Sequence, residues 1–283
     1  MLGCHFKNKK TADVLNKYYA LVIDALDDVV NGLWSFGSGD EHEKEYEDNL
    51  AIFKDSMRQI VVEHRKQKSS GDYQKAPFLD MLIDNIDDED EIVHQAITFI
   101  IGGFHTTGNY LTWFFYNLGC FQDIQTRVID EVSSKDVTNI NDLGSLKMTK
   151  QVMNETLRHE KIATFSERQA EHDVEVDGFI IPKGTQILNA HCVSLDNEDD
   201  FPNPGEFNPD NFSDQRKHGL EFSPFGYGVR KCPGYRFADM EVCIAAVEVL
   251  KKFRIKVAEE DFNIGSKFGF VTKPEREIFV TLQ

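Results

Sequence analysis

The segment FSPFGYGVRKCPGYRFADMEV, residues 222–242, places one cysteine between a glycine-containing loop and an apolar helical pattern. A cysteine binds a metal as its thiolate, and positive potential favours the thiolate. Cys232 is predicted at or just before the N-terminus of a helix over 235–252, where free N–H groups and the helix dipole favour negative charge. A cysteine near the start of a helix more often packs in the core than binds a metal. Cys232 therefore has two interpretations, as a metal ligand or as a core residue.

The residues around Cys232 fit a loop that lets a large flat group approach the backbone. Gly226, Gly228 and Gly234 carry no Cβ atoms that would clash with such a group. Pro233 suits the first turn of the helix because its φ is preset. The stretch GYGVRK lacks the third glycine of a dinucleotide-binding loop, and no predicted strand leads into it, which excludes that class of site.

Composition narrows the class of protein further. The chain has 283 residues and a net charge of −17, which argues against a nucleic-acid-binding surface. No run of about 18 apolar residues is present, and the start MLGCHFKNKK does not resemble a signal peptide. Five widely spaced cysteines without a CxxC pair disfavour a disulfide framework and a zinc ribbon, so a reducing compartment fits best.

The elements predicted to position Cys232 are mainly helical. Asp177-Gly178 lies between two short apolar runs and predicts a β-hairpin over 174–181. The acidic segment 37–48 is predicted as a linker and 66–77 as an exposed loop. The fold class is therefore mainly α with a small β portion late in the chain, including a last strand at 277–282. Helices are predicted at 11–34, 48–66, 91–118, 121–132, 149–160 and 235–252.

The pattern Phe225-x-x-Gly228-x-Arg230-x-Cys232-x-Gly234 resembles, at all five positions, the signature of the cytochrome P-450 superfamily of haem-thiolate monooxygenases. This resemblance implies the cytochrome P-450 fold and a haem cofactor. In that family the cysteine thiolate is the proximal iron ligand. Cys232 is then the metal ligand, Arg230 contacts a haem propionate, Phe225 packs near the sulfur, and Gly228 and Gly234 belong to the cofactor-binding loop.

Other landmarks follow in the family's order. Residues 155–158, ETLR, are similar to its ExxR helix, and GGFHTT at 102–107 is similar to its oxygen-binding segment. Arg168 resembles a second propionate-binding arginine, with a solvated loop charge as the alternative. FNPDNF at 207–212 resembles the loop between ExxR and the cysteine. ETLR, FIIPKGTQILNAH and FNPDNF are most similar to the orphan animal family numbered twenty.

The long helix departs from the family pattern before its threonine. The family usually places an acid there, and the acid and threonine pass protons to dioxygen. Here the acid's position holds His105, followed by Thr106. A histidine can also move protons near neutral pH. Thr106 and His105 are therefore the catalytic candidates, and an ordinary solvated His105 with a broken relay is the alternative.

The loop FNPDNF also departs from the family pattern. It holds Asn211 where the family usually has an arginine that completes a triad with Glu155 and Arg158, the three predicted structural residues. Asparagine offers hydrogen bonds without charge. Either Arg216 substitutes for that arginine, or Glu155 and Arg158 stand as a pair.

The resemblance covers about residues 11–283. It implies that residues 1–283 form one domain, which corresponds to the C-terminal portion of a P-450 catalytic domain. The N-terminal part of that domain would be lacking. The implied activity is insertion of one oxygen atom from O₂ into an unidentified organic substrate. A non-catalytic haem-binding relative, an inactive truncated fragment and a cofactor-free acidic interaction module are the alternatives.

The resemblance also implies partners and a location. The electron donor would be an NADPH-dependent flavoprotein reductase, and no nucleic acid is expected. A full-length relative would lie at the endoplasmic reticulum membrane on its cytosolic face, whereas this chain shows no membrane span and is predicted as cytoplasmic. A basic surface is predicted within 215–236 as the reductase-docking face: Arg216, Lys217, Arg230, Lys231 and Arg236, against Glu221.

Overall fold

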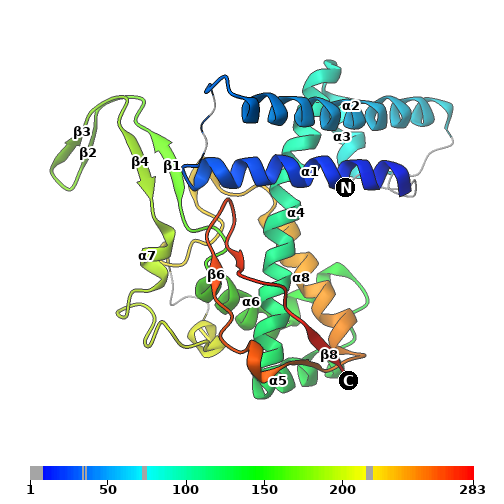
Figure 1. Cartoon of the computed structure of the whole chain (residues 1–283). Helices are drawn as coiled ribbons and strands as arrows, with labels where there is room; N and C mark the ends of the chain where they lie inside the picture. Colours follow the sequence, from blue (N-terminus) through cyan, green and yellow to red (C-terminus); the bar gives the residue numbers. More distant parts are fainter. Residues whose placement is uncertain (1–8, 34, 36, 72–74, 215–218) are drawn as a thin grey trace. The chain divides into compact units, whose positions relative to one another are not determined.

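A computed structural model describes residues 9–33, 35, 37–71, 75–214 and 219–283. The chain forms two compact units, one up to Phe104 and one from His105 to Gln283. The long helix α4 (Glu89–Cys120) contributes to both (Figure 1).

The first unit is helical. It contains α1 (Lys9–Val30), α2 (Glu41–Ser70), α3 (Pro77–Asn85) and the first part of α4. Its buried core is apolar and draws on all four helices, which explains why α1 and α2 pack together despite the strongly charged sequence of α2. The core includes Ile23, Phe53, Met57, Val61, Leu79, Ile92 and Val93.

The prediction of a linker at 37–48 is wrong, because most of this segment forms the first turns of α2. Asp40 caps the helix, its carboxylate accepting a hydrogen bond from the Glu43 N–H at 2.9 Å. The Glu43 carboxylate in turn accepts from the N–H groups of Gly37 and Gly39, both at 2.6 Å. Acidic residues that look solvated in the sequence therefore serve the helix N-terminus, where negative charge is favoured.

The predicted loop at 66–77 is shorter than expected. Helix α2 continues to Ser70 and ends at Gly71, which has a left-handed backbone conformation that favours glycine. Helix α3 was not predicted. It begins at Pro77, a first-turn position that needs no N–H donor, and buries Leu79 and Leu82.

The second unit surrounds one large apolar core. The core joins α4, α5, α6 and α8 with the last strands, and includes Tyr110, Trp113, Val128, Met153, Val242, Cys243 and Val257. The helices after α4 are α5 (Gln122–Ser134), η2 (Ile140–Ser145), α6 (Lys147–Glu160), α7 (His191–Leu195), η3 (Pro209–Phe212), η4 (Gly228–Arg230), α8 (Tyr235–Leu250) and η5 (Glu259–Asp261).

The strands form small antiparallel pairs within the second unit. In the hairpin at 174–181, Asp177 and Gly178 occupy the turn with positive φ, as predicted. The fold class, mainly α with a small β portion late in the chain, is confirmed. The pairs are β1 (Ser166–Gln169) with β4 (Gln186–Asn189), β2 (Val174–Val176) with β3 (Phe179–Ile181), β5 (Ile255–Val257) with β8 (Val280–Leu282), and β6 (Ser266–Lys267) with β7 (Lys273–Pro274).

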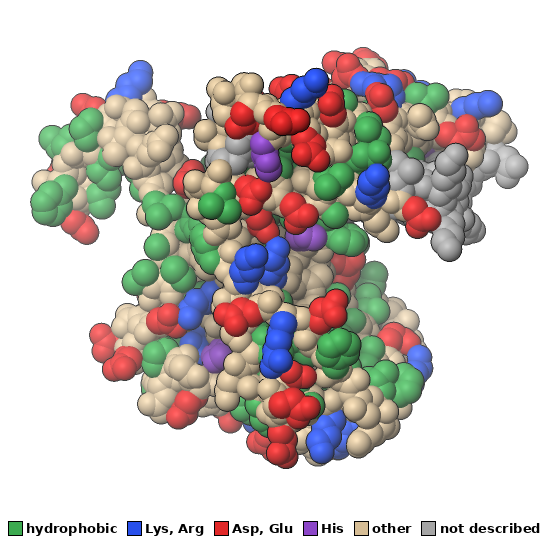
Figure 2. Space-filling model, viewed as in Figure 1, with side chains coloured by type: hydrophobic (Ala, Val, Ile, Leu, Met, Phe, Trp, Pro, Cys, Tyr) green, Lys and Arg blue, Asp and Glu red, His purple; other side chains and the backbone are tan. Residues whose placement is uncertain are grey.

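The surface reflects the acidic composition. Figure 2 shows Asp and Glu side chains spread over the visible face, in keeping with the net charge of −17. Within the described part of the chain, none of the helices combines the length and apolar character needed to cross a bilayer.

Candidate functional site

The loop before α8 holds Cys232 by its backbone. Gly226 and Gly228 both have positive φ, and these left-handed conformations turn the chain back on itself. The Cys232 N–H then donates to the carbonyl oxygen of Phe225 at 2.9 Å. Gly234 is the N-cap of α8, so Cys232 lies just before the helix, as predicted.

Pro233 does not occupy the first helical turn that the sequence suggested, because it precedes the N-cap residue. Its fixed φ therefore stiffens the approach to the helix and leaves the first-turn N–H groups of α8 available.

Cys232 is the accessible thiol of the second unit. It is exposed, whereas Cys120 and Cys192 are half-buried and Cys243 is buried. The Cys243 thiol donates to the Met153 sulfur at 3.3 Å, and burial raises the pKa of Cys243 to about 11. Cys243 therefore packs in the core, as expected, and Cys232 is the cysteine that can reach a ligand.

Charged residues flank this thiol. Arg230 is exposed and has no ion-pair partner among the described residues, so its guanidinium is available to an anion. The Lys231 ammonium lies 3.8 Å from the centroid of the Tyr235 ring, and the Arg236 guanidinium carbon lies 5.6 Å from it. The Arg236 Nε–H also donates to the Tyr235 hydroxyl at 2.9 Å. Sequence reasoning missed Tyr235, although its place between two cations was a signal of cation–π contact.

Glu155 and Arg158 form a fully buried ion pair on α6. The Arg158 Nε–H and Nη2–H groups donate to the two carboxylate oxygens of Glu155, both at 2.8 Å. Both side chains are 0% exposed. The Glu155 carboxylate also accepts from the Asn208 N–H at 2.7 Å and, at 3.4 Å, from the Asn211 amide.

Asn211 thus lies at the place predicted for the third member of this network, with an amide in place of a charge. Arg216, the alternative third member, lies outside the described residues.

Arg158 has a second set of partners that the sequence did not indicate. Its remaining N–H groups donate to the carbonyl of Leu195, the last residue of α7, at 3.2 Å, and to two carbonyls of the loop that follows: Pro204 at 2.9 Å and Glu206 at 3.0 Å. The guanidinium also lies 5.3 Å from the centroid of the Phe201 ring. A single buried arginine therefore fixes the course of the loop that follows α7.

Arg168 lies on β1, opposite Ile187 of β4, with an exposed side chain that donates to the Glu167 carbonyl at 2.7 Å. Two residues earlier, the Ser166 hydroxyl lies 3.0 Å from the His191 ring nitrogen. Partial burial and the charge of Arg168 lower the pKa of His191. Sequence reasoning missed His191, and a histidine just before a cysteine carried no pattern that singled it out.

His105 and Thr106 are adjacent and half-buried on α4, and the His105 carbonyl accepts from the Asn109 amide at 2.8 Å. Phe225 packs against the same core as Tyr110, which follows Thr106 by about one helical turn. The Cys232 loop and this part of α4 therefore share one core. The catalytic roles of His105 and Thr106 stay predictions.

The site combines an accessible thiol at a helix N-terminus, an exposed arginine beside it and a buried Glu-x-x-Arg pair in a mainly helical unit. These features fit a protein that holds a metal-containing cofactor through one cysteine. The family model for cytochrome P450 matches residues 2–281, and the chain belongs to that family.

Curated relatives agree with this assignment. The chain is 34% identical over 200 residues to cytochrome P450 3A19 of Capra hircus aegagrus, which covers 68% of this chain and 92% of that protein. It is 33% identical over 243 residues to cytochrome P450 3A12 of Canis lupus familiaris, which covers 78% of this chain and 48% of that protein. The chain thus spans about half of the dog relative. The narrower likeness to the family numbered twenty stays a prediction.

A solved structure supports the same fold. The crystal structure of the cytochrome P450DA heme domain superposes with a TM-score of 0.81 at 21% identity, covering 95% of this chain and 60% of that one. The predicted cytochrome P450 fold is confirmed.

Proposed function

We propose that this chain is the cysteine-ligand portion of a haem-thiolate monooxygenase that inserts one oxygen atom from O₂ into an organic substrate. The observation that carries the proposal is the exposed Cys232 thiol at the N-terminus of α8 with the exposed Arg230 beside it. Haem, when bound, supplies a redox-active iron whose thiolate ligand favours O–O cleavage.

The residues of the Cys232 loop fit such a cofactor. A Cβ built on Gly226 or Gly228 would meet no atom within 4 Å, so the backbone there is open to a large planar group. Cys232 would hold the iron, and Phe225 would pack near the sulfur. Arg230 would bind one propionate.

Arg168, exposed on β1, would bind the second propionate. The guanidinium is always charged and offers several N–H donors, which suits a carboxylate.

Thr106 and His105 would hold and move protons on α4. A threonine hydroxyl both donates and accepts a hydrogen bond, and a histidine changes charge near neutral pH. The histidine in the acid's position also favours a second candidate function, a haem-binding relative that does not oxidise substrate. Product formation with a reductant separates the two.

The electron donor would be an NADPH-dependent flavoprotein reductase. Arg230, Lys231 and Arg236 are exposed around Cys232 on a chain whose net charge is −17, so this region is locally basic. Such a region steers an acidic partner to one face. Arg216 and Lys217, also expected here, lie outside the described residues.

We propose that residues 1–283 are the C-terminal portion of a single cytochrome P450 catalytic domain. We also propose that a full-length relative lies at the endoplasmic reticulum membrane, on its cytosolic face. The dog relative is about twice as long as the region matched to this chain, which supports the proposal that residues 1–283 are a portion of a longer domain.

The test is the absorption spectrum of the haem-loaded, reduced, CO-treated protein. A thiolate-type Soret band is expected, and Cys232→Ser should abolish it. Cys243→Ser is the matched control and should keep the band, because its thiol is buried against Met153. An unchanged band in Cys232→Ser would refute the assignment, and an ordinary haem band in the wild type would exclude a thiolate ligand.

A further inference from the structure

Tyr235, the first residue of α8, contacts two of the cations beside Cys232. The Lys231 ammonium lies over the tyrosine ring, 3.8 Å from its centroid, and the Arg236 Nε–H donates to the tyrosine hydroxyl at 2.9 Å. The face of an aromatic ring attracts a cation, and a phenol oxygen accepts hydrogen bonds. One tyrosine therefore offers each cation a different acceptor.

These contacts take the place of ion pairs. Lys231 and Arg236 are both exposed, and no carboxylate pairs with either of them within the described part of the chain. Their charges lie 3.8 Å and 5.6 Å from the same ring centroid, so the two cations repel each other over a short distance. The ring and the hydroxyl of Tyr235 offset this repulsion without neutralising either charge. Both charges therefore stay open to a partner.

The ring of Tyr235 is itself supported by the core. Tyr235 is half-buried, and its ring centroid lies 6.2 Å from that of Phe225. Phe225 packs against the large core of the second unit, and its carbonyl accepts from the Cys232 N–H at 2.9 Å. A lysine that lies on a supported ring has less side-chain entropy to lose on docking than a lysine that moves freely.

We propose that Tyr235 is a positioning residue for the docking of an acidic protein partner. Its ring holds Lys231 and its hydroxyl holds Arg236 on the basic region beside Cys232. Tyr235 adds no charge, so it raises the affinity by fixing the cations rather than by strengthening the positive potential. The inference rests on the proposed function, in which the acidic partner is the flavoprotein reductase.

Four variants divide this role into its parts. Tyr235→Phe keeps the ring for Lys231 and removes the hydroxyl from Arg236, whereas Tyr235→Leu removes both, so the difference between the two variants isolates the ring. Lys231→Met removes the cation that the ring holds. Lys183→Met removes an exposed lysine from the turn after β3 and is the control for net charge.

The first measurement is the NMR spectrum of the haem-loaded, reduced, CO-treated protein that carries isotope-labelled lysine. A proton over the face of an aromatic ring is shifted upfield by the ring current. The ε-CH₂ signal of Lys231 should therefore keep its position in Tyr235→Phe and move toward the ordinary lysine position in Tyr235→Leu. The same signal position in Tyr235→Phe and Tyr235→Leu would overturn the proposal, because it would show that the ring does not hold Lys231.

The second measurement is the affinity of the haem-loaded chain for a microsomal-type reductase, by isothermal titration at several salt concentrations. Tyr235→Leu should bind about threefold or more weakly than Tyr235→Phe, which is the scale of immobilising one long side chain. The salt dependence of Kd should be the same in both, because neither changes a charge. Lys231→Met should lower that salt dependence, and Lys183→Met should change neither quantity.

The same pair of variants in the Lys231→Met background completes the test. There Tyr235→Phe and Tyr235→Leu should differ much less in affinity, because the ring has no lysine to hold. An equal difference in both backgrounds, or no difference in the presence of Lys231, would overturn the role of Tyr235. A wild type that binds no reductase would overturn both this role and the proposed electron donor, whereas normal wild-type binding with no effect of the ring would overturn the role of Tyr235 alone.

Discussion

Replacing Arg158 tests how the buried pair on α6 supports the fold. Arg158→Met leaves the Glu155 carboxylate buried without a counter-charge, and breaking a buried pair costs about 3–5 kcal/mol. It also removes the donors to the carbonyls of Leu195, Pro204 and Glu206. Of these three residues, Leu195 is buried, Pro204 is half-buried and Glu206 is exposed. An orphaned buried group costs about 1–3 kcal/mol, so the combined loss from the pair and the Leu195 carbonyl is about 4–8 kcal/mol. Total stability is about 5–15 kcal/mol, and Arg158→Met is expected to accumulate little folded protein.

The double variant Glu155→Met with Arg158→Met separates the two contributions. Replacing a whole buried pair by apolar residues is often nearly neutral, so the charge penalty should disappear. The buried Leu195 carbonyl still lacks its donor, which leaves a loss of about 1–3 kcal/mol. The Asn208 N–H also loses its acceptor in this variant.

The assay is the urea midpoint of the haem-loaded protein, combined with hydrogen exchange of residues 195–212. A lower midpoint and faster exchange in this loop are expected for the double variant. If the double variant had the urea midpoint of the wild type, Arg158 would not act through these backbone carbonyls. Its contribution would then come from the ion pair with Glu155 alone.

Three further predictions concern single side chains. Burial opposes protonation of His159, but its hydrogen bond to Glu160 and the charge of Glu160 raise its pKa above 6.5. The stabilisation that protonated His159 gives the fold is therefore complete below about pH 6.5 and is lost as pH rises through the folded pKa. The difference in unfolding free energy between wild type and His159→Gln should shrink from pH 6.5 upward. A difference that stays constant with pH would contradict this prediction. Lys231→Glu should slow reduction of the haem by a microsomal-type reductase, measured by stopped flow. Added salt should also slow it, because exposed charges are screened beyond about 10 Å at roughly 0.1 M. A reduction rate that changes with neither would show that the basic region has no part in electron transfer. His105→Asp should keep or raise product formed per reductant consumed and His105→Ala should lower it, whereas equal coupling in all three proteins would make His105 a bystander.

The parts of the site that could be predicted from sequence are those fixed by local geometry. Glu155 and Arg158 are three residues apart on a helix, and that spacing brings side chains together on one face. The hairpin follows from Asp177-Gly178 because both residues tolerate a positive φ. The position of Cys232 follows from the loop and helix around it.

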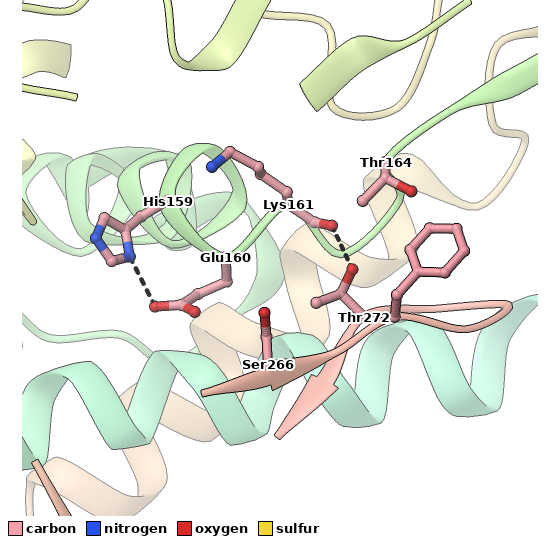
Figure 3. A pocket seen from close by; sticks show the side chains of 7 residues that line it. His159, Glu160, Lys161, Thr164, Ser266 and Thr272 are labelled. Carbon is pink, nitrogen blue, oxygen red and sulfur yellow. Dashed lines mark hydrogen bonds and ion pairs between the residues drawn. The ribbon is translucent and has the colours of Figure 1, made fainter. Parts of the chain in front are cut away.

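The parts that could not be predicted depend on backbone groups and on distant segments. Arg158 is satisfied by three carbonyls 37 to 48 residues away, and a carbonyl carries no sequence signature. Asp40 and Glu43 look like part of a solvated acidic stretch. In the fold, Asp40 accepts from the Glu43 N–H at the start of α2, and Glu43 accepts from the N–H groups of Gly37 and Gly39 in the preceding turn. The hydrogen bond from the Thr272 hydroxyl to the Lys161 carbonyl (Figure 3) joins residues 111 positions apart in the sequence.

The buried pair and the cysteine loop are connected by a row of aromatic rings. Arg158 lies over Phe201, which lies 5.9 Å from Phe212 between ring centroids, and Phe212 lies 4.5 Å from Phe222. Phe222 also packs against the large core that Phe225 contacts, and the Phe225 carbonyl accepts the Cys232 N–H. Because packed rings do not move independently, a loop released from Arg158 would lose the support of this row. These contacts form a packed connection between Arg158 and the core against which the Cys232 loop lies.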